Sequence, residues 1–450
     1  MTSVQNILVG WLDYSEESQR NARVLLSALK SSETLDELGF GILRDAFADV
    51  FFPATNTIMT RTRYLFFVPG LYLMLERNRV PSSEARRHIT ELENRLRKLL
   101  MVSENAYKQN TEKGMPQPPR DYWGIIGREA KEALRRYPSS IYWSALRALG
   151  LLCSGLRFSQ GYYHAQLDRF YVRGKPVKDD DGLSHLASLE SRNWDRDLDS
   201  ILADGKSWVT TDFKLPPSLD FELTTHEARY LKARYDWLSE QRGRPSLLSH
   251  LLNEIKPFDN LNFPWDVPLC PDKLKGAVEH ARLLSMLVRG ATLQYWHMLL
   301  EARRRKNMDA PKYDMSKPLV LWWEQARDDL SRWSVDEFLH LADTNLQALR
   351  GNNDRTFFRQ WLARCLSART GQALLVDEQA QQLIYERERA KRPSKGRLRH
   401  DEYLRRWTPP ETAYLDGLCD PEAVPYHLDY RTRVGRRFFE ETVTALKKGN

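Results

Sequence analysis

The chain has 450 residues, of which 42% are hydrophobic and 28% are charged, and this balance excludes wholesale disorder. Lys and Arg number 68 against 60 Asp and Glu, so the net charge of +8 favours a polyanion as partner, nucleic acid first. The four cysteines lie far apart and form no CxxC pair, which excludes a disulfide framework and predicts reduced thiols in a cytoplasmic protein.

Helical spacing of apolar residues dominates the N-terminal part of the chain. Residues 15–31 predict a helix with Ser15 as its N-cap, and residues 82–100 predict an amphipathic helix with a charged outer face. Between them, the apolar run 64–75 is too short for a membrane span, so we expect a buried helix and no membrane partner. The N-terminus also lacks the positive start and apolar core of a signal peptide. The Pro-rich stretch 109–120 is a predicted linker, which places an N-terminal helical domain at residues 1–108.

The segment TNTIMTRTR, residues 55–63, lies between two apolar runs and is called the hinge below. Its threonine hydroxyls, Arg61, Arg63 and the free N–H groups of a helix beginning near Thr60 would suit a phosphate group of a nucleic acid. In the structural alternative, Thr60 caps that helix and Arg61 or Arg63 pairs with Asp45 or Asp49. The sequence favours the structural alternative, and both arginines stay candidate nucleic-acid contacts.

Residues 121–173 have the spacing of a helix-turn-helix or winged-helix-like module. A predicted helix at 122–136 meets a short turn, and a second helix at 139–152 opens with Ser139 or Ser140 as its cap. Because the second helix begins with Ile-Tyr-Trp, a packing face, a buried helical hairpin is favoured over a groove reader. If the module does bind nucleic acid, we expect it to neutralise phosphates through Lys131, Arg135, Arg136 and Arg147.

A loop-rich connector is predicted at 174–223 and a second helical domain at 224–385. Thr224 and Glu227 have the spacing of a capping box, and a long helix is expected at 272–305 with Gly290 as a candidate bend. The basic run 301–306 would complement the negative end of that helix without any ligand. Strand-like alternation is confined to residues 208–215 and 426–432. We therefore predict a mainly α, multi-domain protein with few short strands.

The basic C-terminal segment, residues 386–450, contains the strongest functional signal. Between positions 387 and 406, nine Lys or Arg residues accompany three acids, a net charge of +6, and the helix is broken by a turn at 393–396. A flexible basic turn beside Tyr403 and Trp407 suits contacts with the nucleic-acid backbone and base stacking. A dock for an acidic protein partner and a plain solvated surface remain the alternatives. The nine candidate contacts are Arg387, Arg389, Lys391, Arg392, Lys395, Arg397, Arg399, Arg405 and Arg406.

Patterns for catalysis and for metal binding are lacking. The ten histidines form no HExxH, HxH or Cys/His cluster, so we expect neither a metal nor a cofactor. There is no GxSxG motif and no phospholipase-D-like signature. His427, Asp429 and Arg431 would share one face of a short strand and form an acid/base group, although a structural ion pair is favoured. We assign no catalytic residue on this basis.

Five stretches of the chain resemble a bacterial family that is named only as a domain of unknown function. They are GWLDYSEE (10–17), DELGFGILRDAFADVFFPATNTIMTRTRYLFFVPG (36–70), PSSIYWSALRALG (138–150), ERERAKRPSKGRLR (386–399) and LDYRTRV (428–434). The resemblance covers most of the chain. Genes of this family lie near restriction, helicase and phospholipase-D-like genes in phage-defence neighbourhoods, so the resemblance implies a defence component. It supplies no catalytic residues.

Charge, motifs and resemblance together predict a non-enzymatic subunit of a bacterial antiviral system. We expect it to bind nucleic acid, DNA in preference to RNA, through the basic C-terminal turn, and to dock on a larger helicase or nuclease. One alternative is a nuclease whose active site is assembled from dispersed residues. The other is a pure protein–protein assembly scaffold.

Overall fold

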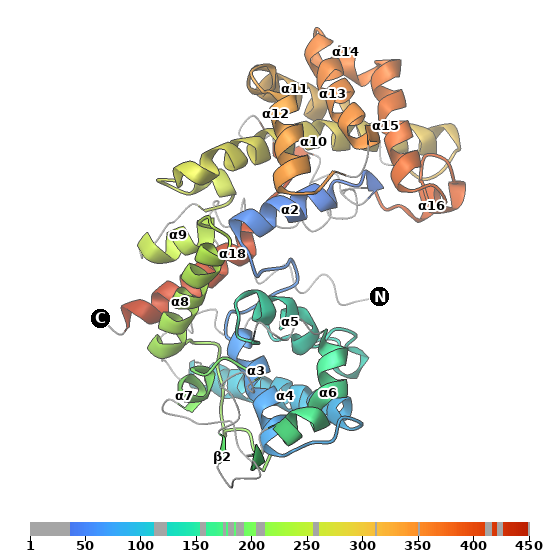
Figure 1. Cartoon of the computed structure of the whole chain (residues 1–450). Helices are drawn as coiled ribbons and strands as arrows, with labels where there is room; N and C mark the ends of the chain where they lie inside the picture. Colours follow the sequence, from blue (N-terminus) through green and yellow to red (C-terminus); the bar gives the residue numbers. More distant parts are fainter. Residues whose placement is uncertain are drawn as a thin grey trace. The chain divides into compact units, whose positions relative to one another are not determined.

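The computed structural model describes residues 37–111, 124–153, 159–173, 177–178, 184–185, 193–203, 212–254, 261–310, 313–349, 352–409, 416–420 and 426–448. This part of the chain is mainly helical, which confirms the predicted fold class (Figure 1). It divides into two compact units. Unit 1 is formed by Met1–Ala48 with Lys275–Tyr430, and unit 2 by Asp49–Leu274 with Arg431–Asn450. Each unit therefore combines stretches that are far apart in the sequence.

The helices of unit 2 form two groups. In the first, α3 packs on α4 and α5, and α4 also contacts α6; in the second, α8, α9 and α18 pack on one another (Figure 1). The bounds are α3 Tyr64–Arg77, α4 Ala85–Thr111, α5 Pro138–Ala148, α6 Gln160–Arg173, α7 Leu198–Ala203, α8 Thr225–Gln241, α9 Leu247–Glu254 and α18 Thr432–Lys447. Two-residue strands, β1 Val177–Lys178 and β2 Ser184–His185, pair antiparallel.

Local sequence signals account for several of these helices. The apolar run 64–75 is buried throughout as the first three turns of α3, as predicted. The Thr224–Glu227 capping box is present at the start of α8, so that prediction is also confirmed. In α18, Gly435 lies against the Phe52 ring, and a Cβ atom at this position would overlap the ring. None of the helices in the described ranges is long and apolar enough to cross a lipid bilayer.

Unit 1 is built around the long helix α10, Asp272–Arg305, which confirms the helix predicted at these residues. It continues through Gly290, where the missing side chain makes room for the Trp322 indole. Around it, α11 packs on α13 and α14, and α13 packs on α12 and α15. The bounds are α11 Ser316–Ser331, α12 Val335–His340, α13 Asn352–Ser367, α14 Gly371–Leu375, α15 Glu378–Lys391 and α16 Asp401–Arg406; α2, Gly41–Phe51, crosses the boundary between the units.

Three local predictions are wrong in the residues that the structure describes. The described part of the predicted helix 122–136 consists of turns and one 3-10 turn at Lys131–Ala133, so a helix-turn-helix is not formed there. Gly124 and Gly127, with φ of 96° and 79°, adopt left-handed conformations that an α-helix excludes. Likewise, residues 426–429 are not a strand, and Tyr430 and Arg431 have φ of 49° and 63°. The other strand candidate, 208–215, is without strand in its described residues, 212–215.

Candidate functional site

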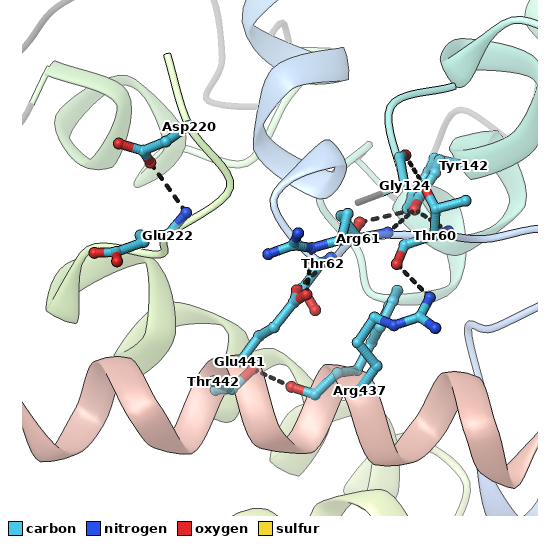
Figure 2. Close-up of polar contacts among 11 residues, drawn as sticks. Thr60, Arg61, Thr62, Gly124, Tyr142, Asp220, Glu222, Arg437, Glu441 and Thr442 are labelled. Atoms are coloured by element: carbon cyan, nitrogen blue, oxygen red, sulfur yellow. Dashed lines mark hydrogen bonds and ion pairs between the residues drawn. The ribbon is translucent and has the colours of Figure 1, made fainter. Parts of the chain in front are cut away.

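The hinge is closed by a carboxylate from α18 rather than left open for a ligand (Figure 2). Glu441 accepts a hydrogen bond from Arg61 Nε at 2.5 Å and a second from the backbone N–H of Thr62 at 2.8 Å. Arg437, one turn earlier on α18, donates to the carbonyl of Thr60 at 2.5 Å, and burial lowers its pKa to about 10. An internal carboxylate thus takes the position that we considered for a phosphate group.

The phenol of Tyr142 fixes the hinge to α5. Its oxygen accepts hydrogen bonds from the N–H groups of Thr60 and Arg61 at 3.0 and 3.1 Å, and donates to the Arg61 carbonyl at 2.7 Å. The Thr60 hydroxyl donates to the Gly124 carbonyl at 2.6 Å. One buried side chain therefore pairs with three backbone groups, two of which are donors with no helical partner.

We expect Tyr142→Phe to lower the free energy of unfolding of unit 2 by about 1–3 kcal/mol, because it leaves buried N–H groups without an acceptor. Denaturant unfolding and faster hydrogen exchange of the amides of Thr60 and Arg61 measure this effect. The matched control is Tyr64→Phe, since the Tyr64 oxygen accepts a hydrogen bond from the N–H of Ile126 alone among the described backbone groups. Equal losses for the two variants would contradict the assigned role of Tyr142.

As in the structural alternative, Arg61 and Arg63 form ion pairs within the protein, but their partners are not Asp45 or Asp49. Arg63 pairs with Asp220 at 2.7 Å and with Glu227 at 3.3 Å. The two aspartates considered in the sequence have other partners: Asp45 pairs with Arg44, and Asp49 with Arg431. Helix α3 starts at Tyr64 with Arg63 in the N-cap position, so Thr60 is not its cap.

Four of the nine candidate cations between residues 387 and 406 form ion pairs with acids of unit 1. The Arg387 guanidinium, whose side chain is 3% exposed, pairs with Asp354 at 2.5 Å and donates to the Leu38 carbonyl at 2.8 Å. It lies over the rings of Phe40 and Phe357. Lys391 binds the same Asp354 carboxylate at 2.7 Å. Burial by itself would raise the pKa of Asp354, but these two cations outweigh it and lower that pKa below its usual value.

The turn after α15 is held by two further buried acids, so it is not the flexible loop expected from its sequence. Glu37 pairs with Arg392 at 3.3 Å and with Arg397 at 3.4 Å. Glu388, which is fully buried, accepts hydrogen bonds from the Tyr295 hydroxyl at 2.6 Å and from the Arg397 N–H at 2.7 Å. Four of the nine candidate cations, Arg387, Lys391, Arg392 and Arg397, therefore serve the packing of unit 1.

The other five of the nine candidate cations are exposed. Arg389 pairs with Glu386, Arg406 pairs with Glu402, and Arg399 donates to the Pro393 carbonyl. Lys395 and Arg405 form no ion pair with a carboxylate in the described parts of the chain. These five side chains are the solvent-accessible members of the nine candidates.

The structure places the basic run 301–306, which the sequence explains as helix-end chemistry, beside α16. Arg303, at the end of α10, donates to the carbonyls of Leu404 and Trp407 at 3.3 and 2.6 Å, and Lys306 pairs with Asp401. These contacts join the end of α10 to α16, about a hundred residues later in the chain. We call the exposed cations at the end of α10, in the turn after α15 and on α16 the cationic surface: Arg304, Arg305, Lys306, Lys395, Arg399, Arg405 and Arg406.

The three arginines proposed for the helix-turn-helix region lie in unit 2. Arg135 and Arg136 precede α5 and Arg147 is in its last turn, and all three are exposed. They form no ion pair with any carboxylate that the structure describes. Ile141, Tyr142 and Trp143 of α5 are buried, as expected for a packing helix.

Of the residues considered for acid/base chemistry, His427 is buried and Arg431 is paired within the protein. The His427 ring is buried, and its two nitrogens have no hydrogen-bond partner in the described part of the protein. Burial, then the nearby charges of Arg289 and Arg44, lowers the pKa of His427 well below its usual range. Arg431 binds Asp49 and the Thr55 carbonyl. Within the described ranges, no group of three or more His, Cys, Asp or Glu residues is placed to hold a metal ion.

Comparison with known proteins gives a family but no function. Neither a curated protein nor a solved structure matches the chain. A family model described as "Family of unknown function (DUF6361)" matches residues 7–417, which is most of the chain. The protein therefore belongs to the DUF6361 family of unknown function.

Proposed function

We propose that the protein is a non-enzymatic subunit that binds nucleic acid, DNA in preference to RNA, through the cationic surface of unit 1. The observation that carries this proposal is the joining of two basic runs by Arg303, which clusters exposed cations that are distant in sequence. Exposed Lys and Arg residues bind phosphates and release condensed counterions, which supplies affinity without reading the sequence. Arg61 and Arg387 do not contribute, because both are buried and paired.

We further propose that this subunit acts in a bacterial antiviral system in the cytoplasm, docked on a larger helicase or nuclease. Support comes from the resemblance to a family whose genes lie in phage-defence neighbourhoods. The main alternative is an assembly scaffold, which would bind its protein partner with no nucleic acid. A nuclease is the other alternative, and loss of a metal-dependent cleavage activity in Asp429→Ala would favour it.

Charge reversal at three residues of the cationic surface tests the binding proposal. We expect the variant Arg305→Glu, Arg399→Glu, Arg405→Glu to bind a fluorescent DNA at least tenfold more weakly than the unchanged protein at about 0.1 M salt. Its plot of log K against log salt concentration should also be shallower, by about 0.9 for each lost phosphate contact on duplex DNA and about 0.7 on single strands. Fluorescence anisotropy measures both quantities.

A variant with the same change in net charge is the control. Arg135→Glu, Arg136→Glu, Arg147→Glu alters three exposed arginines of unit 2 and leaves unit 1 unchanged. We expect it to lose much less affinity than the unit 1 variant. Equal losses would show a general charge effect, and unchanged binding by the unit 1 variant would refute the proposed surface.

A further inference from the structure

An aromatic side chain lies among the cations of the cationic surface. Tyr403 of α16 is half-buried, and the Arg406 guanidinium lies over its ring at 5.9 Å. The His400 ring meets it edge-on, with centroids 6.3 Å apart and an angle of 83° between the rings. Trp407, the other ring expected to stack on bases, is 5% exposed and is part of the core. Of the two rings expected to stack on bases, Tyr403 is therefore the one that a ligand can reach.

The position of Tyr403 is fixed by the contacts that join α16 to α10. Arg303 binds the carbonyls of Leu404 and Trp407, on the last turn of α16 and just after it. Lys306 pairs with Asp401 in the first turn. Both ends of this six-residue helix are thus tied to a helix of 34 residues. A ring held in this way loses little conformational entropy when a flat ligand stacks on it.

An aromatic ring paired with a guanidinium, beside cations that bind phosphates, is suited to stacking on a nucleic-acid base. Bases of single strands stack on aromatic rings and on guanidinium planes, whereas the bases of a duplex are already stacked on one another. The Arg406 side chain is 69% exposed, and its charge is held by Glu402 at 2.7 Å. Arg405 is its neighbour in the sequence and Arg399 precedes it by seven residues. Both are exposed, so both are available to the backbone of the same strand.

We propose that the cationic surface binds single-stranded nucleic acid, with one base stacked on the Tyr403–Arg406 pair. This inference rests on the proposed function and adds the class of ligand to it. The cations supply affinity for any phosphate polymer, and the Tyr403–Arg406 pair supplies the preference for a strand whose bases are free.

The test uses three oligonucleotides of equal length: oligo-dT, an abasic strand with the same number of phosphates, and a duplex. We expect the unchanged protein to bind oligo-dT about tenfold more tightly than the abasic strand, and more tightly than the duplex. Tyr403→Ala should reduce binding of oligo-dT to the abasic level and leave the abasic strand unaffected. Tyr403→Phe, which keeps the ring, should retain the preference. Anisotropy at a fixed salt concentration gives these ratios.

The outcomes separate this inference from the proposal on which it rests. If Tyr403→Ala weakens oligo-dT and the abasic strand equally, or if the duplex is bound as well as oligo-dT, the stacking inference is refuted and the cationic surface is retained. If reversing Arg305, Arg399 and Arg405 leaves both single strands bound as before, the cationic surface itself is refuted.

Discussion

Replacing Asp354 with alanine is expected to lower the free energy of unfolding of unit 1 by about 3–5 kcal/mol, because it leaves a buried guanidinium without its counter-ion. Arg387 and Asp354 have side chains that are 3% and 7% exposed. Without the carboxylate, Arg387 would keep its hydrogen bond to the Leu38 carbonyl and its place over the rings of Phe40 and Phe357. Neither compensates fully for the loss of a charge partner in a site that excludes water.

Hydrogen exchange of the amides of α13 and α15 measures this loss within unit 1, where a melting curve of the two-unit chain would average over both. The control is Asp336→Ala, which removes an exposed ion pair to Arg359 in the same unit; its side chains are 71% and 53% exposed. Pairs of this kind contribute about 0–1 kcal/mol. The double variant Asp354→Leu, Arg387→Met should recover much of the stability. Similar losses for Asp354→Ala and Asp336→Ala would contradict the assigned role.

Elements with a local cause were predictable from the sequence. The capping box of α8 lies within four residues, and the helix of residues 272–305 is specified by a long periodic pattern. The length of the apolar run in α3 was enough to predict a buried helix in place of a membrane span. The helix predicted at 122–136 is wrong for an equally local reason: Gly124 and Gly127 both have a positive φ, which an α-helix excludes.

The partners of the arginines were not predictable, because they are specified by tertiary structure. Glu441 lies 380 residues after Arg61. The summed charge of residues 387–406 contains no information that Asp354 and Glu37 neutralise part of it from elsewhere in the chain. For the same reason, the sequence identifies the basic run 301–306 but not its place beside α16, which only the contact of Arg303 with the Trp407 carbonyl shows. A count of charges thus shows that the segment is basic but not which of its cations are exposed.

The second large effect is a pH dependence in unit 2 that originates in Glu93. This residue of α4 is 3% exposed and accepts a hydrogen bond from the N–H of Ser139, at the start of α5, at 2.6 Å. Burial raises the pKa of Glu93 to about 7, although the hydrogen bonds from Ser139 oppose the shift. Between about pH 4.3, the pKa of Glu93 in the unfolded chain, and pH 7, the Glu93 carboxyl is therefore neutral in the folded protein and ionised in the unfolded chain. Stability from this group is full below about pH 4 and is lost as the pH rises to 7.

Glu93→Gln should remove this dependence, since the amide keeps an acceptor for Ser139 and carries no charge at any pH. We expect the variant and the unchanged protein to be about equally stable at pH 5, and the variant to be more stable at pH 8 by roughly 2–3 kcal/mol. His164, linked to the same region through Tyr72 and Gln160, acts in the opposite direction. Burial, then Arg86, lowers its pKa to about 4, so it destabilises the fold as the pH falls.

Because His164 is present in both proteins, the difference between them isolates Glu93. Denaturant unfolding at pH 5, 6, 7 and 8, followed through the exchange of the α4 and α5 amides, gives that difference. Glu91→Gln is the control, since Glu91 lies on the same helix with its side chain 55% exposed and pairs only with Arg87 among the described cations. We expect the free energy of unfolding of Glu91→Gln, plotted against pH, to run parallel to that of the unchanged protein. If the Glu93→Gln curve does so as well, Glu93 is ionised in the fold at neutral pH, and the N–H groups at the start of α5 outweigh the cost of burying its charge.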